Sequence, residues 1–280
     1  MPRFCVLASG SSGNAAFLQT EGFGLLIDIG IGPRLLSSRL ACIGASWKDV
    51  NAVVLTHVHT DHWKDRSLAQ LCTHRIPLYC HPEHVEVLSH YGPAFEPLQR
   101  AGLVRHFEDD QTLELPNSLR CLPIRVPHDS EPTFAFRIDG SSGLFGGDWS
   151  IGYAADLGTT PIRLLDAFRD VNVLALEFNH DEEMQHRSGR SKHLIDRVLG
   201  DRGHLSNRQA ADSLGSHLRS SRPGSLRHLI QLHLSRQCNS PALALAAAKK
   251  VLEGIAPSIV IQTAAWDRPT NAIELAMELV

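Results

Sequence analysis

No run of apolar residues in this 280-residue chain approaches the ~18 consecutive positions that a membrane-spanning helix needs. The first residues lead directly into a strand-like segment and lack the charged region, long apolar stretch and cleavage site of an export signal. No linker-like or low-complexity stretch divides the sequence, and 43% apolar residues are enough to build one core. These absences predict a single domain over residues 1–280 in a cytoplasmic protein without membrane contact.

Cysteine is also scarce, and no pair of cysteines has the CxxC spacing of a zinc or redox motif. In a chain without an export signal, scattered cysteines indicate reduced and mostly buried thiols. Cys80 and Cys238 lie nearest the histidine-rich segments, so a ligand role for either is kept as an alternative. The six positions are Cys5, Cys42, Cys72, Cys80, Cys121 and Cys238.

Strand-like and helix-like patterns alternate along most of the chain. Apolar segments predict strands near 4–8, 15–19, 24–28, 52–55, 77–80, 104–107, 112–115, 119–125, 133–138, 151–155, 173–176, 229–232 and 259–262. Helical patterns cover 33–42, a segment after His62, 82–90, 161–168, 191–199, 206–218 and 241–252, with Ser206 and Ser240 as expected N-caps. This order predicts the α/β class: an αββα four-layer sandwich of two mixed sheets with helices outside.

Four side chains that can bind metal lie within six residues, directly after the predicted strand 52–55. In His57-Val58-His59-Thr60-Asp61-His62, the first two histidines alternate with Val58, so both imidazoles point the same way in an extended segment. Neutral imidazole is a preferred ligand of zinc and related metals. Asp61 and His62 follow a turn and are placed to begin a second site. The spacing therefore predicts two neighbouring metal ions at a strand end, where loops line a cleft.

This hexapeptide resembles the signature of the metallo-β-lactamase superfamily, and the resemblance implies further ligands. Asp28 matches the early aspartate that orients the histidine motif from behind. His128 matches the third histidine of the first metal site, and His233 matches the last ligand of the second. Asp156 matches the aspartate that bridges both metals. A second Gly-Asp pair, within Leu144-Phe145-Gly146-Gly147-Asp148-Trp149, makes Asp148 an alternative to Asp156.

Three further segments resemble the YycJ (WalJ) type of metallo-β-lactamase-fold hydrolase, over about residues 4 to 270. They are Ser9-Gly10-Ser11-Ser12-Gly13-Asn14, Glu177-Phe178-Asn179-His180-Asp181 and Gly203-His204-Leu205-Ser206-Asn207. Members of that family are generally regarded as metal-dependent nucleases or phosphodiesterases, with DNA as the usual proposed substrate. The resemblance implies site positions for His180, His204 and Asp181, the last in support of the ligands, and substrate contacts for Asn14 and Asn207.

The net charge of −3 hides a strong asymmetry along the chain. Residues 187–236 carry nine arginines and one lysine against three aspartates, a balance of +7, whereas residues 1–186 have a balance of −9. Basic side chains gathered near a presumed metal ligand predict contacts to the phosphates of a nucleic acid, with a solvated helix face as the alternative. The candidates are Arg187, Arg190, Lys192, Arg197, Arg202 and Arg208.

These patterns together predict a phosphodiesterase or nuclease that acts on DNA. Two divalent ions, zinc first with manganese or iron as alternatives, would lie ~3.5–4 Å apart and share a hydroxide, formed from a bound water whose pKa is lowered to ~7. Asp61 would also steer this hydroxide, and His204 would protonate the leaving alkoxide, with His180 next in line for that role. The alternatives are an ester, thioester or lactam hydrolase with the same metals, and a non-catalytic metal-binding protein. The oligomeric state is left open.

Overall fold

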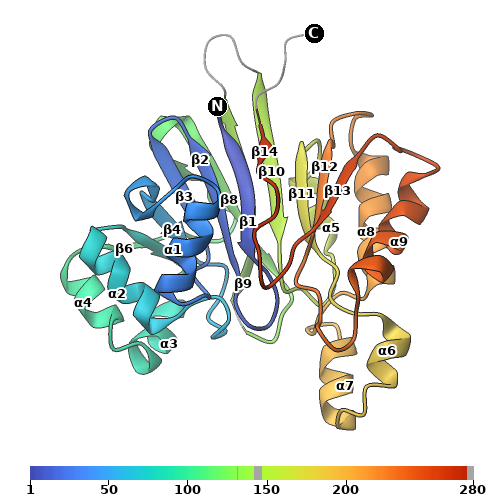
Figure 1. Ribbon diagram of the computed structural model, residues 1–280, viewed down its shortest axis with the longest axis horizontal. Helices are drawn as coiled ribbons and strands as arrows, with labels where there is room; N and C mark the ends of the chain where they lie inside the picture. Colours follow the sequence, from blue (N-terminus) through green and yellow to red (C-terminus); the bar gives the residue numbers. More distant parts are fainter. Residues whose placement is uncertain (131, 142–146, 276–280) are drawn as a thin grey trace.

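Two sheets of seven strands lie face to face in the middle of the molecule (Figure 1). The computed structural model describes residues 1–130, 132–141 and 147–275. The first sheet has the order β14 (Ile273–Glu274), β1 (Arg3–Ala8), β2 (Ala15–Thr20), β3 (Phe23–Ile27), β4 (Ala52–Val54), β5 (Leu78–Cys80) and β6 (Val104–His106). The second has the order β13 (Val260–Thr263), β12 (His228–Leu232), β11 (Val173–Glu177), β10 (Asp148–Ala154), β9 (Thr133–Ser141), β8 (Leu119–Val126) and β7 (Leu113–Leu115).

Both sheets are mixed, and their pairing decides which strand ends meet. Strands β3 to β6 are parallel in the first sheet, and β10 to β13 are parallel in the second. Antiparallel β9 separates β8 from β10, so β8 runs in the same direction as β10. The carboxyl ends of β8, β10, β11 and β12 therefore share one edge of the second sheet, where ligands commonly bind in α/β folds.

Helices cover the outer face of each sheet, as Figure 1 shows. Helices α1 (Pro33–Cys42), α2 (Asp65–His74), α3 (His84–Tyr91) and α4 (Phe95–Arg100) lie outside the first sheet. Helices α5 (Ile162–Ala167), α8 (Asn207–Ser220) and α9 (Pro241–Leu252) lie outside the second, and α6 (Glu182–His186) and α7 (Lys192–Leu199) extend at its lower end. Two short 3-10 turns, η1 (Trp47–Asp49) and η2 (Pro116–Ser118), complete the order.

Three buried apolar clusters separate these four layers. Strand β1 illustrates the cause, because Phe4 and Val6 point between the sheets while Cys5 and Leu7 point to the helices. The cluster between the sheets is rich in aromatic side chains, including Phe134. A third cluster lies between the second sheet and its helices. Burial on both faces makes the strands near-continuous apolar runs, which is why they could be recognised in the sequence.

The predicted αββα sandwich of two mixed sheets is confirmed, and so are both predicted helix caps. The Ser206 side chain accepts a hydrogen bond from the backbone of Gln209 and forms a capping box, and Ser240 caps α9 ahead of Pro241. The unpredicted elements are short: α4, α6 and β14 have six, five and two residues. Segments of this length contain too few positions to show a period.

The cysteines are mostly buried, as the sequence predicts. All six cysteines are free thiols; four of them are buried, whereas Cys42 is exposed and Cys72 is partly exposed. Within the described ranges, no helix is long and apolar enough to cross a membrane.

Candidate metal centre

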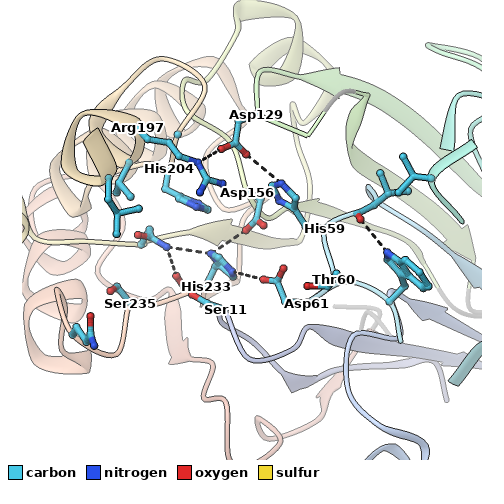
Figure 2. A pocket seen from close by; sticks show the side chains of 18 of the residues that line it. Ser11, His59, Thr60, Asp61, Asp129, Asp156, Arg197, His204, His233 and Ser235 are labelled. Atoms are coloured by element: carbon cyan, nitrogen blue, oxygen red, sulfur yellow. Dashed lines mark hydrogen bonds and ion pairs between the residues drawn. The ribbon is translucent and has the colours of Figure 1, made fainter. Parts of the chain in front are cut away.

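The predicted ligands lie at the ends of strands from both sheets. The segment from His57 to His62 follows β4 of the first sheet, and His128, Asp156 and His233 follow β8, β10 and β12 of the second. Figure 2 shows the edge at which they meet, with His59, Asp61, Asp156 and His233 pointing toward one another. Chain segments far apart in sequence thus contribute to one site because the strand ends share an edge.

A left-handed backbone conformation places three of these side chains. Asp28, Asp156 and His233 each lie one or two residues beyond a strand and have φ angles of 61°, 54° and 54°. Residues other than glycine rarely adopt this region, and its cost is accepted mainly at functional sites. The left-handed residue changes the chain direction where the strand ends.

Seven potential ligands form two overlapping groups, each with its ligand atoms within 4.8 Å of one another. The Asp156 carboxylate belongs to both groups. Its Oδ2 lies 3.0 Å from Nε2 of His62 and 3.4 Å from Nε2 of His57, and its Oδ1 lies 2.9 Å from Nδ1 of His233. The first group is His57, His59, His128 and Asp156; the second is Asp61, His62, Asp156 and His233.

Hydrogen bonds behind the ligands fix the orientation of their rings. Asp28 accepts a bond of 2.7 Å from Nδ1 of His62, and the backbone and hydroxyl of Thr56 donate to the same carboxylate. Nδ1 of His128 donates to the carbonyl of Gly203 at 2.9 Å. In each case the other ring nitrogen faces the cluster, which is the arrangement that supports metal ligation.

Burial keeps the histidines of the first group neutral. It lowers the pKa of His57 well below the ordinary value, lowers that of His59, and lowers that of His128 to about 4; nearby carboxylates oppose this only in part. Neutral imidazole is the form that binds metal. These three side chains are therefore in the ligating state across the physiological pH range.

The second group contains charged histidines that compensate its carboxylates. Burial would lower the pKa of His62, but the carboxylates of Asp28 and Asp156 outweigh it and raise that pKa to about 10. The pKa of His233 is raised well above the ordinary value because Asp156 likewise outweighs burial. Conversely, these two histidines hold the pKa of Asp156 well below its ordinary range, against the opposing effect of burial. A divalent cation would supply the same positive charge.

The donor set fits a metal ion on direct structural grounds. Nε2 of His57 and Oδ1 of Asp156 are buried, and neither forms a hydrogen bond of normal geometry in the part of the chain that the structure describes, although Oδ1 of Asp156 lies 2.9 Å from Nδ1 of His233. A buried polar atom without a partner is costly, and a metal bond would satisfy it. Five histidines and two aspartates suit zinc or a related transition metal.

A third group of potential ligand atoms joins Glu177 and His204 to Asp156 and His233. Glu177, at the end of β11, is fully buried and accepts a hydrogen bond of 2.7 Å from Nδ1 of His204. It also accepts from the backbone of Leu157 and Leu205 and lies 3.1 Å from Nδ1 of His233. Burial would lower the pKa of His204, but the Glu177 carboxylate outweighs it and raises that pKa. His204 is thus held next to the cluster by a carboxylate that favours its protonated form.

The ligands open into a pocket of about 940 Å³ between the two halves of the fold. Val58, Trp63 and Tyr91 form part of one wall, and α7 and the residues before it form the other, with Arg190 and Arg197. The Arg197 guanidinium pairs with Asp129, whose carboxylate lies 3.4 Å from Nε2 of His59 (Figure 2). The pocket therefore joins an apolar wall, a basic wall and the ligand cluster.

Several other predicted site residues are buried around the centre and do not line the pocket. Asn14 is fully buried and contacts Nε2 of His62 at 2.9 Å and the backbone of Gly10, so it supports the ligands. Asn207 is buried and pairs with Asn239. His180 is fully buried, and burial lowers its pKa to about 4. Asp181 caps α6 by accepting from the backbone of Met184.

The remaining candidates occupy different parts of the surface. Arg202 donates to the carbonyl of His128, whereas Arg208 is exposed and pairs with Glu182. Asp148 begins β10, at the end opposite Asp156, so the structure keeps it away from the ligand groups; residues 144–146 of its motif lie outside the described residues. Neither Cys80 nor Cys238 joins a ligand group among the described residues.

Sequence reasoning missed the roles of Glu177 and Asp129. Glu177 follows the apolar segment Val173–Leu176, so its position at a strand end was the signal that could have identified it. Asp129 directly follows His128 and lies 3.3 Å from its Nε2. Arg197 was among the predicted basic residues, but its pairing with Asp129 depends on tertiary structure.

Comparison with known proteins agrees with this geometry. A family model described as "Beta-lactamase superfamily domain" matches residues 25–218. The chain belongs to the metallo-β-lactamase superfamily. "Exodeoxyribonuclease YycJ" of Bacillus anthracis is 27% identical over 257 residues, which cover 89% of each chain. "Exodeoxyribonuclease WalJ" of Streptococcus pneumoniae, from strain D39, is 26% identical over 218 residues, 76% of this chain and 75% of that protein.

A solved structure shares the fold. Zn(2+)-bound PqqB from Methylobacterium extorquens aligns with a TM-score of 0.67 at 15% identity, over 98% of this chain and 100% of that chain. With the His/Asp groups described above, membership of the superfamily identifies the chain as a metal-dependent hydrolase with a site for divalent metal.

Proposed function

We propose that this chain is a nuclease that hydrolyses phosphodiester bonds of DNA with two divalent metal ions. The observation that carries the proposal is the pair of His204 and Glu177, which places an imidazole held by a buried carboxylate beside the ligand groups and in the lining of the pocket. The choice of DNA is supported by the names of two relatives that match most of this chain.

The two ligand groups would each hold one ion, with Asp156 between them, and zinc is the first candidate, ahead of manganese and iron. Bound ions would activate a water molecule at neutral pH and neutralise charge on the phosphorus oxygens. Asp28, Thr56 and the Gly203 carbonyl would keep the histidine rings in their ligating orientation. The chain therefore needs no serine or cysteine nucleophile.

His204 would complete the reaction at the leaving group. Cleavage of a phosphodiester expels an alkoxide, which is a poor leaving group at neutral pH unless it is protonated. Nδ1 of His204 is occupied by Glu177, so Nε2 is the nitrogen that can donate a proton into the pocket. The ligand histidines cannot take this role because their free nitrogens face the metal sites.

The basic wall of the pocket would bind the phosphates of the DNA strand. Arg190 and Arg197 both line it, and the guanidinium of Arg190 is positioned by the side-chain carbonyl of Gln237 at 2.8 Å. Phosphate contacts of this kind dominate the affinity of proteins for nucleic acids. They also favour a phosphodiester over a neutral ester or lactam as the substrate.

A comparison of two substrates tests this proposal. The variant His204→Ala should slow cleavage of end-labelled DNA by about 10²- to 10⁴-fold, because general acid catalysis contributes on that order. Hydrolysis of bis-p-nitrophenyl phosphate should change far less, since p-nitrophenolate leaves without protonation. Metal content, measured by elemental analysis, should stay at two ions per chain. Equal losses on both substrates would show that His204 is not the acid.

The substrate class is tested with wild-type enzyme loaded with zinc, manganese or iron. DNA should be cleaved, whereas a thioester and a cephalosporin should be poor substrates. Faster turnover of the thioester or the cephalosporin than of DNA would replace the nuclease by the alternative hydrolase.

A further inference from the structure

An exposed aromatic side chain lies next to the metal centre but outside its pocket. Trp266 is 44% exposed, and the guanidinium of Arg236 stacks over its ring at 4.0 Å. The two residues come from different loops, Arg236 after β12 and Trp266 after β13. Neither has a role in holding the ligands.

Short backbone connections tie this pair to the pocket. Ser9 donates its backbone N–H to the carbonyl of Ala265, the neighbour of Trp266, at 3.1 Å. The Ser9 hydroxyl accepts a hydrogen bond of 2.8 Å from the backbone of His233, a predicted ligand. On the other side, the neighbours of Arg236 line the pocket: Ser235, which Figure 2 labels, and Gln237. The pair therefore continues the rim of the pocket.

The positive charge of Arg236 is not neutralised by a neighbour among the residues that the structure describes, which favours the binding of an anion beside Trp266. Arg236 is exposed and forms no ion pair with a carboxylate in the described ranges. The nearby Asp267 faces Arg268 at 3.9 Å, so its charge is partly compensated. Gln237 in turn positions Arg190 on the basic wall. A row of positive charge thus leads from the pocket to the indole.

We infer that Trp266 and Arg236 form a stacking platform for a nucleotide of the single-stranded substrate, adjacent to the nucleotides held in the pocket. Aromatic rings and guanidinium planes are the surfaces on which unpaired bases stack, and a nearby positive charge holds the phosphate of the same nucleotide. A base paired in a duplex presents no free face to such a surface. The platform rests on the proposed nuclease function and adds the form of the substrate that it takes.

The alternative is that Arg236 and Trp266 form only a surface cation–π contact that stabilises two loops. Such contacts are common on protein surfaces. The two interpretations differ in their effect on substrate, because a purely structural pair would change stability without changing the binding of a nucleic acid.

Tryptophan fluorescence provides a direct measurement when the protein is compared with its Trp266→Leu variant, because Trp47 and Trp149 are buried away from the pocket and the signal of Trp63, which lines the pocket, is common to both proteins. Trp47, Trp63 and Trp149 are 9%, 4% and 2% exposed, so a single-stranded oligothymidylate that stacks on the surface should quench Trp266. The titration uses metal-loaded His204→Ala protein, which should bind the strand but cleave it slowly. Quenching should fall to the part that Trp63 contributes when Trp266→Leu is added to this background, and Trp266→Phe should retain most of the affinity in a competition assay.

Kinetics with otherwise wild-type enzyme give the second readout. Trp266→Leu should raise KM for oligothymidylate roughly tenfold, because stacking contributes at about that level per base. Arg236→Gln should raise KM and make its salt dependence shallower by about one charge. Hydrolysis of bis-p-nitrophenyl phosphate should be unchanged in both, which also establishes that they fold. Arg268→Gln is the matched control and should behave as wild type.

Each outcome decides between the platform and its alternatives. Unchanged KM and unchanged quenching in Trp266→Leu, with active wild-type nuclease, would overturn the platform and leave the nuclease function intact. Wild-type protein that hydrolyses the small diester but neither binds nor cleaves DNA would overturn both. A Trp266→Leu variant that loses activity equally on the small diester would make the pair structural.

Discussion

The orientation of His62 depends on one buried carboxylate, Asp28, that has no contact with the substrate pocket. Burial raises the pKa of Asp28, but the imidazole of His62 donates to its Oδ2 and the backbone N–H of Thr56 donates to its Oδ1. Asp28→Asn removes a negative charge that keeps the His62 ring in its ligating orientation. Metal affinity should fall about 10- to 100-fold, as is usual for such supporting groups. Competition with a coloured chelator measures this.

Asp148→Asn is the control for that measurement and separates the two candidate bridging aspartates, Asp148 and Asp156. Asp148 begins β10 and Asp156 follows its other end, so the control should bind metal like the wild type. Strong loss of metal in Asp148→Asn, with little in Asp156→Asn, would instead make Asp148 the bridging residue.

Among the connecting segments, the loop before α8 is sensitive to substitution because it supports two histidines at once. A Cβ atom at Gly203 would lie 2.2 Å from the carbonyl oxygen of Val198, so Gly203→Ala must move the loop. The same residue accepts the hydrogen bond of His128 and precedes His204. We expect weaker metal binding and slower DNA cleavage, measured on the same preparation. Gly200→Ala, where the nearest atom is 3.1 Å away, should have a small effect.

Helix α7 and the residues before it are the part of the basic segment that faces the pocket. Arg190→Gln and Arg197→Gln should each weaken DNA binding and reduce the slope of log affinity against log salt by about 0.7 to 0.9 per lost phosphate contact. Arg208→Gln is the matched control, because Arg208 pairs with Glu182 and does not line the pocket. Binding isotherms at several salt concentrations measure the slopes. Equal slopes in all three variants would make the segment a solvated face.

Short-range patterns were sufficient to predict the elements that carry ligands. Strand β4 and the histidine motif are adjacent in sequence, and the Ser206 cap acts within three residues, so both could be inferred locally. Contacts between segments far apart in the sequence could not be inferred in this way. The contact of Glu177 with His204 and the pairing of β14 with β1 join segments whose proximity only the folded chain creates. The burial of Asn14 and Asn207 has the same origin.

At the scale of the whole molecule, buried neutral histidines should make stability depend on pH. Burial lowers the pKa of His217 and of His84 to about 4, below the ~6.5 of an unfolded chain. Their contribution to stability is therefore complete above pH ~6.5 and is lost as the pH falls toward about 4. Each should add up to about 1.4 kcal/mol per pH unit to the slope of the unfolding free energy.

His217 offers the cleaner test, since neither of its ring nitrogens has a hydrogen-bond partner within the described residues. Urea unfolding of metal-free protein, repeated between pH 7 and pH 4, should give a smaller loss of free energy for His217→Leu than for wild type. Parallel curves would contradict the assignment.

The origin of the ligands has a mechanical consequence. His57, His59, Asp61 and His62 extend from the first sheet, whereas His128, Asp156 and His233 extend from the second, and each ligand group contains members of both. A bound ion is thus a cross-link between two layers that otherwise adhere through apolar packing and the C-terminal strand. Ion binding is thermodynamically coupled to the association of the two layers. An ion present at a hundred times its Kd would therefore add about 2.7 kcal/mol to the free energy needed to separate them. Scarcity of metal would then weaken the architecture itself as well as the chemistry.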